Sequence, residues 1–369
     1  MSETFWINDK DLDMEQGRAV QNIGLDESFL IRGPAGSGKT NILLLRAKRL
    51  VLKKLSNIKV VVFTSSLRDF MHMGCTQYGI PPEIVITGVR LFRDLLDEYG
   101  VSYTLTKDFG LDRDLLAGEV KALIEAHGIS NIFDSLLIDE AQDYTDTELW
   151  VLRRLTKRLV LAADTRQSIY KVTHTPGLLE KLTSDKSVNL KYHYRSGLHI
   201  CMVADSILKD SKNFPSIAGE SKYDEKLRPS SVVLVRCANF DSQIDAILKK
   251  IGPQLSLYPT DHIGVLFPKK EQCIIFEKAL SSSPLIGSDR IWFDTLHGGK
   301  GWEFRAVHIG GCEALYRMGA TQKRLTYTGI LRAKTSVSLY YSGSIPGYLD
   351  SAVAVLSPPP DDTELSDLF

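Results

Sequence analysis

Residues 33–40 carry the pattern with the clearest chemistry in this chain, GPAGSGKT, which matches G-x-x-x-x-G-K-[ST] at every fixed position. An apolar run, Phe29 to Ile31, precedes it, and a helix-like run, Asn41 to Lys53, follows it. In this context the glycines let backbone N–H groups turn towards phosphate oxygens. The lysine would reach the β- and γ-phosphates, and the last hydroxyl would hold Mg²⁺. We therefore predict a nucleoside triphosphate bound by Gly33, Gly36, Ser37, Gly38, Lys39 and Thr40.

A second motif supplies carboxylates. Residues 136–144 read LLIDEAQDY, an apolar strand that ends in an Asp-Glu pair. Asp139 would bind Mg²⁺ together with Thr40, and Glu140 would orient and deprotonate the attacking water. Ligands of parallel α/β sheets bind at the carboxyl ends of the strands, where both motifs would lie. The pair of motifs therefore predicts hydrolysis of ATP with Mg²⁺ as the metal.

Composition narrows the class of protein. Lys plus Arg equals Asp plus Glu at 45 each, so the net charge is zero; this argues against coating nucleic acid by bulk charge but leaves a local basic track open. The five cysteines form no C-x-x-C pair, and scattered thiols are typical of a reducing compartment. The first residues lack the pattern of a signal peptide, and no apolar run approaches membrane-spanning length. We expect a cytoplasmic protein without a membrane partner.

Apolar, β-branched runs alternate with helical patterns along the chain, which favours parallel sheets covered on both faces. Two series of runs predict two α/β domains, residues 1–190 and 191–345, with a small helical insertion at about 97–131. The end of the chain is broken by prolines and acidic, so residues 346–369 are predicted to be a disordered tail. The expected strands are 29–31, 59–63, 84–86, 135–138 and 159–162 in the first domain and 232–235, 263–267, 291–293, 306–309 and 337–341 in the second.

With these motifs in order, the chain resembles the superfamily 1 DNA helicases of the UvrD, Rep and PcrA type, in a compact form with reduced insertions. The similar segments are DMEQGRAV, VVVFTSS, DEAQD, LVLAADTRQSIY, YHYRSG, TLHGGKGWEF and RLTYTGILRAKT. The resemblance spans roughly residues 5 to 342. It implies two RecA-like domains with an ATP site in the cleft between them, closing as ATP is hydrolysed.

The resemblance also implies roles for single residues. Gln16 and Tyr194 would contact adenine, Glu303 the ribose or the cleft, and Gln167 would sense the γ-phosphate. Arg195 and Arg332 would bring positive charge to the transition state from the second domain, which phosphoryl transfer requires. The residues expected to contact nucleic acid are Phe63, Thr64, Tyr170, Thr295 and His297.

Three departures from the family pattern keep two functions open. The chain is short, Val172 stands where the family usually has a base-stacking aromatic, and Leu331 stands where it has threonine. Stacking contributes about 1–3 kcal/mol per base, so the grip on a single strand is expected to be weaker. One function is a translocase or helicase, 3′ to 5′, acting on single-stranded or tailed DNA. The other is an ATPase switch or sensor subunit, activated by DNA or a partner, of a nuclease, repair or anti-phage defence complex.

Overall fold

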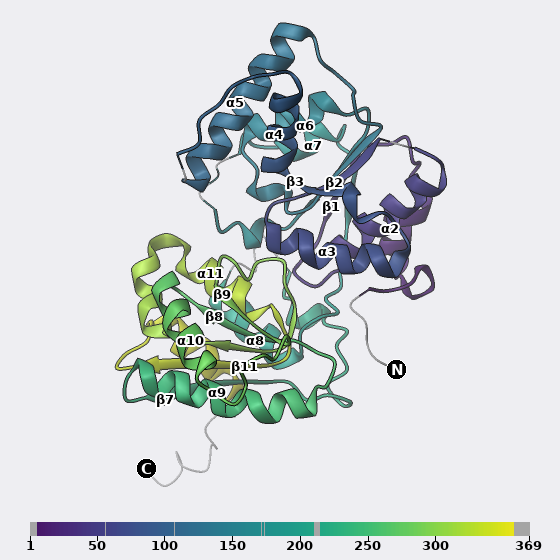
Figure 1. Cartoon of the computed structure of the whole chain (residues 1–369). Helices are drawn as coiled ribbons and strands as arrows, with labels where there is room; N and C mark the ends of the chain where they lie inside the picture. The colour runs from purple at the N-terminus through teal and green to yellow at the C-terminus, as the bar shows by residue number, and fades with distance from the viewer. Residues whose placement is uncertain are drawn as a thin grey trace. The chain divides into compact units, whose positions relative to one another are not determined.

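The computed structural model describes residues 6–55, 57–106, 108–170, 172, 174–209 and 215–357. The chain folds as two compact units, Met1–Tyr192 and His193–Phe369. Each unit is built on a parallel β-sheet with helices on both of its faces (Figure 1). No helix within the described ranges is both long and apolar enough to span a membrane.

The sheet of the first unit has six strands in the order β3-β2-β4-β5-β1-β6, and every neighbouring pair is parallel. Its central strands are buried on both faces, as the burial of all residues of β4 and β5 shows. The strands are β1 (Phe29–Arg32), β2 (Ile58–Val62), β3 (Val85–Thr87), β4 (Ser135–Ile138), β5 (Leu159–Ala163) and β6 (Ser187–Asn189).

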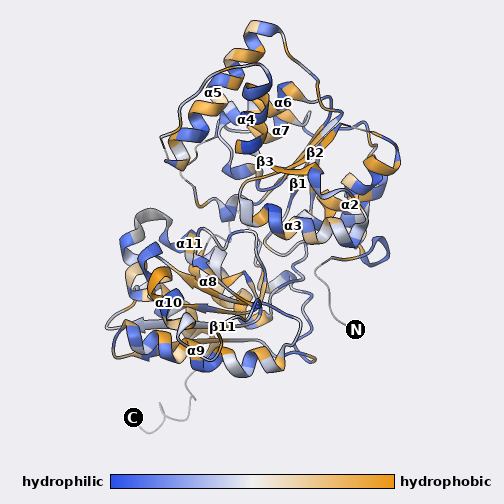
Figure 2. Ribbon diagram, viewed as in Figure 1, coloured by the Kyte–Doolittle hydropathy of each residue, from blue (hydrophilic) through white to orange (hydrophobic). Residues whose placement is uncertain are grey.

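Helices cover the first sheet from both sides. On one face α4, α5 and α6 pack a single core cluster against side chains of β1, β2, β4 and β5, while α2 and α3 pack on β2, β3 and β5. Figure 2 shows β1 and β2 as strongly hydrophobic between helices that alternate in hydropathy. The helices are α1 (Met14–Gly17), α2 (Lys39–Leu52), α3 (Ser65–Tyr78), α4 (Gly88–Glu98), α5 (Phe109–His127), α6 (Asp146–Leu155) and α7 (Leu178–Leu182).

The sheet of the second unit has five parallel strands in the order β7-β11-β10-β8-β9. Helices α9 and α10 form a core with β8, β9 and β10, and α8, α11 and α12 pack on the β7 and β11 side. The elements are α8 (Leu198–Ile207), β7 (Ser231–Cys237), α9 (Phe240–Leu257), β8 (Ile263–Phe267), α10 (Lys270–Ser281), β9 (Ile291–Thr295), β10 (Phe304–Ile309), α11 (Gln322–Ile330), β11 (Ala333–Ser342) and α12 (Gly347–Val353).

The predicted α/β fold class with two RecA-like parallel-sheet domains is confirmed by these two sheets, and each of the ten expected strands is present. The sequence did not reveal β6, an edge strand with Val188 as its single buried residue. The predicted disordered tail begins too early, because Leu349 and Ala352 are buried on α12, which packs on α8. Residues 358–369 of that tail lie outside the described residues.

Candidate nucleotide-binding site

The loop between β1 and α2 carries the residues that the sequence predicts to bind phosphate. Gly36 and Gly38 adopt positive φ angles of 69° and 88°, which side chains other than glycine rarely tolerate. A Cβ added to Gly38 would lie 2.7 Å from the amide nitrogen of Gln16, and one added to Gly33 would lie 2.5 Å from the hydroxyl of Ser37. The backbone angles and close neighbours therefore favour glycine in this loop, which leads directly into the N-terminus of a fourteen-residue helix.

Lys39 is held on the inside of this loop. Its ammonium donates to the carbonyls of Gly33 and Pro34, at 2.9 Å each, and the side chain is buried. The helix N-terminus and the ammonium thus provide fixed positive charge in one small region. A triphosphate is the kind of ligand that this arrangement fits.

Thr40 and Asp139 meet at the end of the sheet although 99 residues separate them. The Thr40 hydroxyl donates to Oδ2 of Asp139 at 2.8 Å, and the N–H of Glu140 donates to Oδ1 of Asp139 at 2.9 Å. Hydroxyl and carboxylate oxygens are the ligands that Mg²⁺ prefers. The two residues therefore fit the metal that the sequence analysis predicted at this position.

Asp139 and Glu140 are adjacent in the chain, and both are buried. Burial, with Coulombic repulsion from Glu140, raises the pKa of Asp139 to about 6, while Thr40 and Lys39 act in the opposite direction. Glu140 itself has a φ of 52°, in the left-handed region that non-glycine residues seldom adopt. Such conformations gather at functional sites, where surrounding contacts hold them in place.

Gln142 is one residue whose side chain contacts Glu140. Its side-chain amide donates to Oε2 of Glu140, and its side-chain oxygen accepts from the N–H of Asp164 at 3.0 Å. Oδ2 of Asp164 in turn accepts from the amide of Gln167 at 2.9 Å. The predicted catalytic carboxylate and the predicted γ-phosphate sensor are thereby connected through two further residues, all buried.

Gln16 lies against the phosphate loop. Its side chain donates to the Ser37 carbonyl at 2.9 Å and also accepts from the N–H of Asp13 in a capping box. Arg46 of α2 holds the same segment, because its guanidinium donates to the carbonyls of Ala19 and Ile23. The structure places Gln16 beside the loop and leaves its predicted contact with adenine a prediction.

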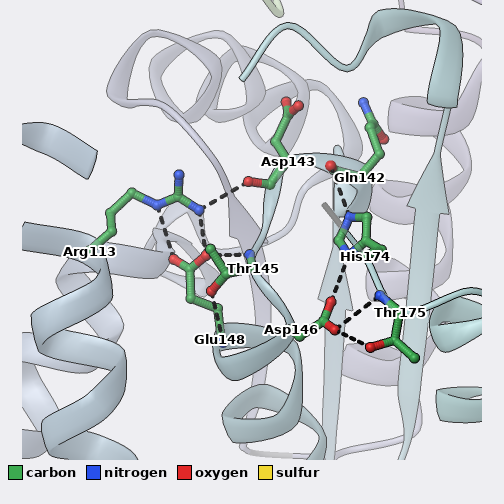
Figure 3. Close-up of polar contacts among 8 residues, drawn as sticks. All are labelled: Arg113, Gln142, Asp143, Thr145, Asp146, Glu148, His174 and Thr175. Carbon is green, nitrogen blue, oxygen red and sulfur yellow. Dashed lines mark hydrogen bonds and ion pairs between the residues drawn. The ribbon is translucent and has the colours of Figure 1, made fainter. Parts of the chain in front are cut away.

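The segment after Glu140 is held from two sides (Figure 3). From α5, Arg113 forms a buried ion pair with Glu148 and donates to the Asp143 carbonyl at 3.0 Å. From the other side, His174 lies between the Gln142 carbonyl and the Asp146 carboxylate, at 3.1 Å from each. Two residues that lie about 30 positions away in the sequence, Arg113 and His174, therefore contact the loop that carries the predicted catalytic base.

Three residues expected to contact nucleic acid have structural contacts in the first unit. The Phe63 ring is buried, with its centroid 4.6 Å from that of Tyr170 and 4.3 Å from the Arg113 guanidinium carbon. Thr64 caps α3 by accepting from the N–H of Leu67 at 3.1 Å. In this structure Phe63 is a core residue, because neighbouring side chains bury its ring. The contacts of Thr64 and Tyr170 with bases stay predictions.

Of the two predicted arginines of the second unit, Arg195 contacts the segment that carries Arg332. Arg195 forms an ion pair with Glu303 and donates to the carbonyl of Leu331 at 3.3 Å, the residue before Arg332. Arg332 is buried, and its Nε donates to the Thr328 carbonyl at 3.1 Å. Glu303 therefore pairs with an arginine in this unit, and its predicted contact with ribose stays a prediction.

The remaining predicted residues of this unit are Tyr194, Thr295 and His297. Tyr194 is exposed, as an aromatic that contacts a ligand must be. The Thr295 hydroxyl accepts from the N–H of Gly298 at 3.1 Å and so shapes the turn that follows β9. Burial, and then the charge of Lys300, lower the pKa of His297.

Sequence reasoning did not assign Gln142, His174, Arg113 or Arg46 a role at the nucleotide site. Gln142 stood within the DEAQD string, so the motif itself was the signal that could have identified it. The other three carry no such signal, because their partners lie at least 22 residues away in the chain. Only the fold brings these side chains together.

Comparison with known proteins adds little to this geometry. No known protein family and no curated protein matches the chain. Among solved structures, the chain is similar to the PRRSV helicase, with a TM-score of 0.43 and 14% sequence identity over 89% of this chain and 54% of that one. The chain thus spans about half the length of that helicase.

Proposed function

We propose that the protein hydrolyses ATP and uses the energy to move along single-stranded DNA. The observation that carries this proposal is the meeting of Thr40, Asp139 and Glu140 at the carboxyl end of one parallel sheet, beside the phosphate loop. The order of motifs after Leu159, which resembles that of superfamily 1 helicases, supports nucleic acid as the second ligand. A P-loop kinase of small molecules would leave those motifs unexplained.

Each residue of the first unit has a role in this proposal. The loop amides and Lys39 bind the β- and γ-phosphates, and Thr40 with Asp139 hold Mg²⁺, which neutralises phosphate charge. Glu140, fixed by Gln142, orients the attacking water and accepts its proton. Gln167, fixed by Asp164, contacts the γ-phosphate. Gln16 contributes to adenine recognition from its place beside the loop.

The second unit supplies cations in this proposal. Arg195 and Arg332 stabilise the charge that spreads over the transferred phosphoryl group, which is the established role of arginines in such reactions. Tyr194 contacts adenine, and Thr295 and His297 contact DNA. Movement of the two domains with each turnover would carry a bound strand in the 3′ to 5′ direction, as the family resemblance implies.

The packing of the aromatic side chains favours a second function, that of an ATPase switch. The Phe63 and Tyr170 rings pack on each other, and Val172 replaces the usual stacking residue. Trp302 also packs within its own unit, with its ring 6.0 Å from Phe304 and nearly parallel to it. A weakened grip on DNA suits an ATPase switch that a DNA end or a protein partner activates, such as a subunit of a nuclease, repair or defence complex.

One experiment separates the two functions. ATP hydrolysis is measured with and without single-stranded DNA, and strand displacement is measured on duplexes with 3′ or 5′ tails. Stimulation with displacement of the 3′-tailed duplex supports the translocase, and stimulation without displacement supports the switch. If no nucleic acid changes the rate of hydrolysis, both DNA-dependent functions are rejected and a protein-activated ATPase remains.

Two variants test the nucleotide site directly. We expect Lys39→Ala to abolish hydrolysis because it removes the positive charge that would contact the β- and γ-phosphates. We expect Glu140→Gln to retain ATP binding but to lose about 10²-fold or more in kcat, as loss of a general base predicts. Hydrolysis is followed by phosphate release and binding by fluorescent-nucleotide titration. Wild-type turnover by the Lys39 variant would refute the site assignment.

A further inference from the structure

The imidazole of His174 joins two chain segments that surround the predicted base. One ring nitrogen lies 3.1 Å from the main-chain oxygen of Gln142, and the other lies 3.1 Å from Oδ1 of Asp146 (Figure 3). A carbonyl and a carboxylate are both acceptors, so each ring nitrogen of His174 faces an acceptor in this bridge. The His174 side chain therefore links the Gln142 carbonyl to the Asp146 carboxylate.

Asp146 is itself fixed at the start of α6. Its Oδ2 accepts from the backbone N–H of Thr175 at 3.0 Å and from the hydroxyl of Thr175 at 2.6 Å. Partial burial opposes ionisation, but the hydrogen bonds from Thr175 and His174 lower the pKa of Asp146 below its usual value. The carboxylate thus anchors residues 174–175 to the segment that follows Glu140.

The other end of this bridge leads to Glu140. The carbonyl that His174 contacts belongs to Gln142, whose side chain contacts Oε2 of Glu140 and the N–H of Asp164. Two contacts in series, His174 to the Gln142 main chain and the Gln142 side chain to Glu140, therefore connect the imidazole to the carboxylate. Since Glu140 occupies a left-handed conformation, its orientation depends on these neighbours.

We propose that His174 is a positioning residue that makes the orientation of Glu140 depend on the conformation of the segment after Gln167. The inference rests on the proposed function, which gives Glu140 the role of base, and on the sequence-based prediction that Tyr170 of the same segment contacts nucleic acid. DNA bound at this segment would then act on hydrolysis through His174, Gln142 and Glu140. A discrete chain of contacts of this kind is a physical route for coupling between two sites.

The test compares His174→Phe with Thr175→Val. Phenylalanine keeps a ring of similar size without donors, whereas Thr175→Val removes one bond to Asp146 and leaves the contact between His174 and Gln142. We expect kcat of His174→Phe to fall about tenfold or more, since small misplacements of catalytic groups have effects of this size. The Kd for ATP should stay within about twofold, and Thr175→Val should keep the wild-type kcat.

Two further measurements distinguish positioning from general stability. In the Glu140→Gln background, His174→Phe should change the residual single-turnover rate less than about twofold, because the two residues act as a unit. His174→Gln, which can still donate to one acceptor, should have an intermediate kcat and also serves if His174→Phe does not fold.

Unchanged kcat in His174→Phe, an equal loss in Thr175→Val, or additivity with Glu140→Gln would each overturn the inference. The proposed function fails in a different way, namely if the wild-type protein shows no hydrolysis that depends on Lys39.

Discussion

His308 shows how a single buried polar residue can set the response of this protein to acid. It lies on β10 with no solvent exposure, between the Tyr340 hydroxyl at 2.9 Å from Nδ1 and Oε1 of Gln254 at 2.7 Å from Nε2. Because the amide oxygen only accepts, Nε2 carries the proton and Nδ1 accepts from tyrosine. Burial, and then the charge of Lys250, lower the pKa of His308 to about 3.

This lowered pKa predicts loss of stability in acid. Between about pH 6.5 and 3 the unfolded state binds a proton at His308 and the folded state does not, so the free energy of unfolding falls as pH falls through that window. The loss is on the order of 2 kcal/mol by pH 5 and larger at lower pH. Urea unfolding at pH 7, 6 and 5 measures this first part of the loss. His308→Gln should unfold with a smaller dependence on pH, and an equal slope in both proteins would contradict the assignment.

At the scale of elements, α5 is an integral part of the first core. The sequence predicted a small helical insertion at about 97–131, and α5 packs on α4 and α6 with Leu116, Val120 and Leu123 buried. Its Arg113 pairs with Glu148, which also accepts from the N–H of Thr145 in the capping box of α6. One ion pair thus ties α5 to the helix that follows the predicted catalytic loop.

Breaking this buried pair from one side should be costly. We expect Arg113→Met to lower the free energy of unfolding by about 3–5 kcal/mol, because it leaves a buried carboxylate without its partner. Arg113→Met combined with Glu148→Gln should regain part of the loss, since the glutamine oxygen can still cap α6.

The matched control is the exposed pair Arg90–Asp94 on α4. Arg90→Met should cost no more than about 0.5 kcal/mol, as is usual for pairs on a helix surface. Urea denaturation compares the variants. Equal effects at the two sites would show that burial of Arg113 is not what makes its pair important.

At the scale of the whole molecule, the residues needed for the proposed reaction are divided between two units. The phosphate loop and both carboxylates belong to residues 1–192, and Arg195 and Arg332 belong to residues 193–369. Each unit has a parallel sheet and a core of its own. Binding of the triphosphate is therefore expected to depend on the first unit, whereas its hydrolysis is expected to depend on both.

Arg332 provides the test at this scale. We expect Arg332→Ala to lower kcat by about 10³-fold or more while the Kd for ATP changes little, because an arginine of this kind acts on the transition state. Arg332→Lys should not restore the rate, since lysine lacks the planar fork of donors. Arg317→Ala, a change of an exposed arginine in the same unit, is the control. Normal turnover by Arg332→Ala would exclude this role.

How far the fold could be predicted depended on the strength of local patterns. Strands such as β4 and β8 are fully buried, and their continuous apolar runs were evident in the sequence. The sequence did not predict β6, because an edge strand needs few apolar residues. It did not predict α12, because two buried residues give only a weak helical pattern of apolar positions. Both elements are stabilised by neighbours that the sequence does not place beside them.

The sequence by itself determined where the predicted phosphate loop and the carboxylate pair lie in the chain, because each motif consists of neighbouring residues. Gly36 and Gly38 permit the positive φ angles of the loop, and an apolar run delivers Asp139 to a strand end. Only the tertiary structure decided that Thr40 meets Asp139 and that His174 meets Gln142. These contacts join residues 99 and 32 positions apart, and the physical reason is the order of strands in the sheet, which no local pattern encodes.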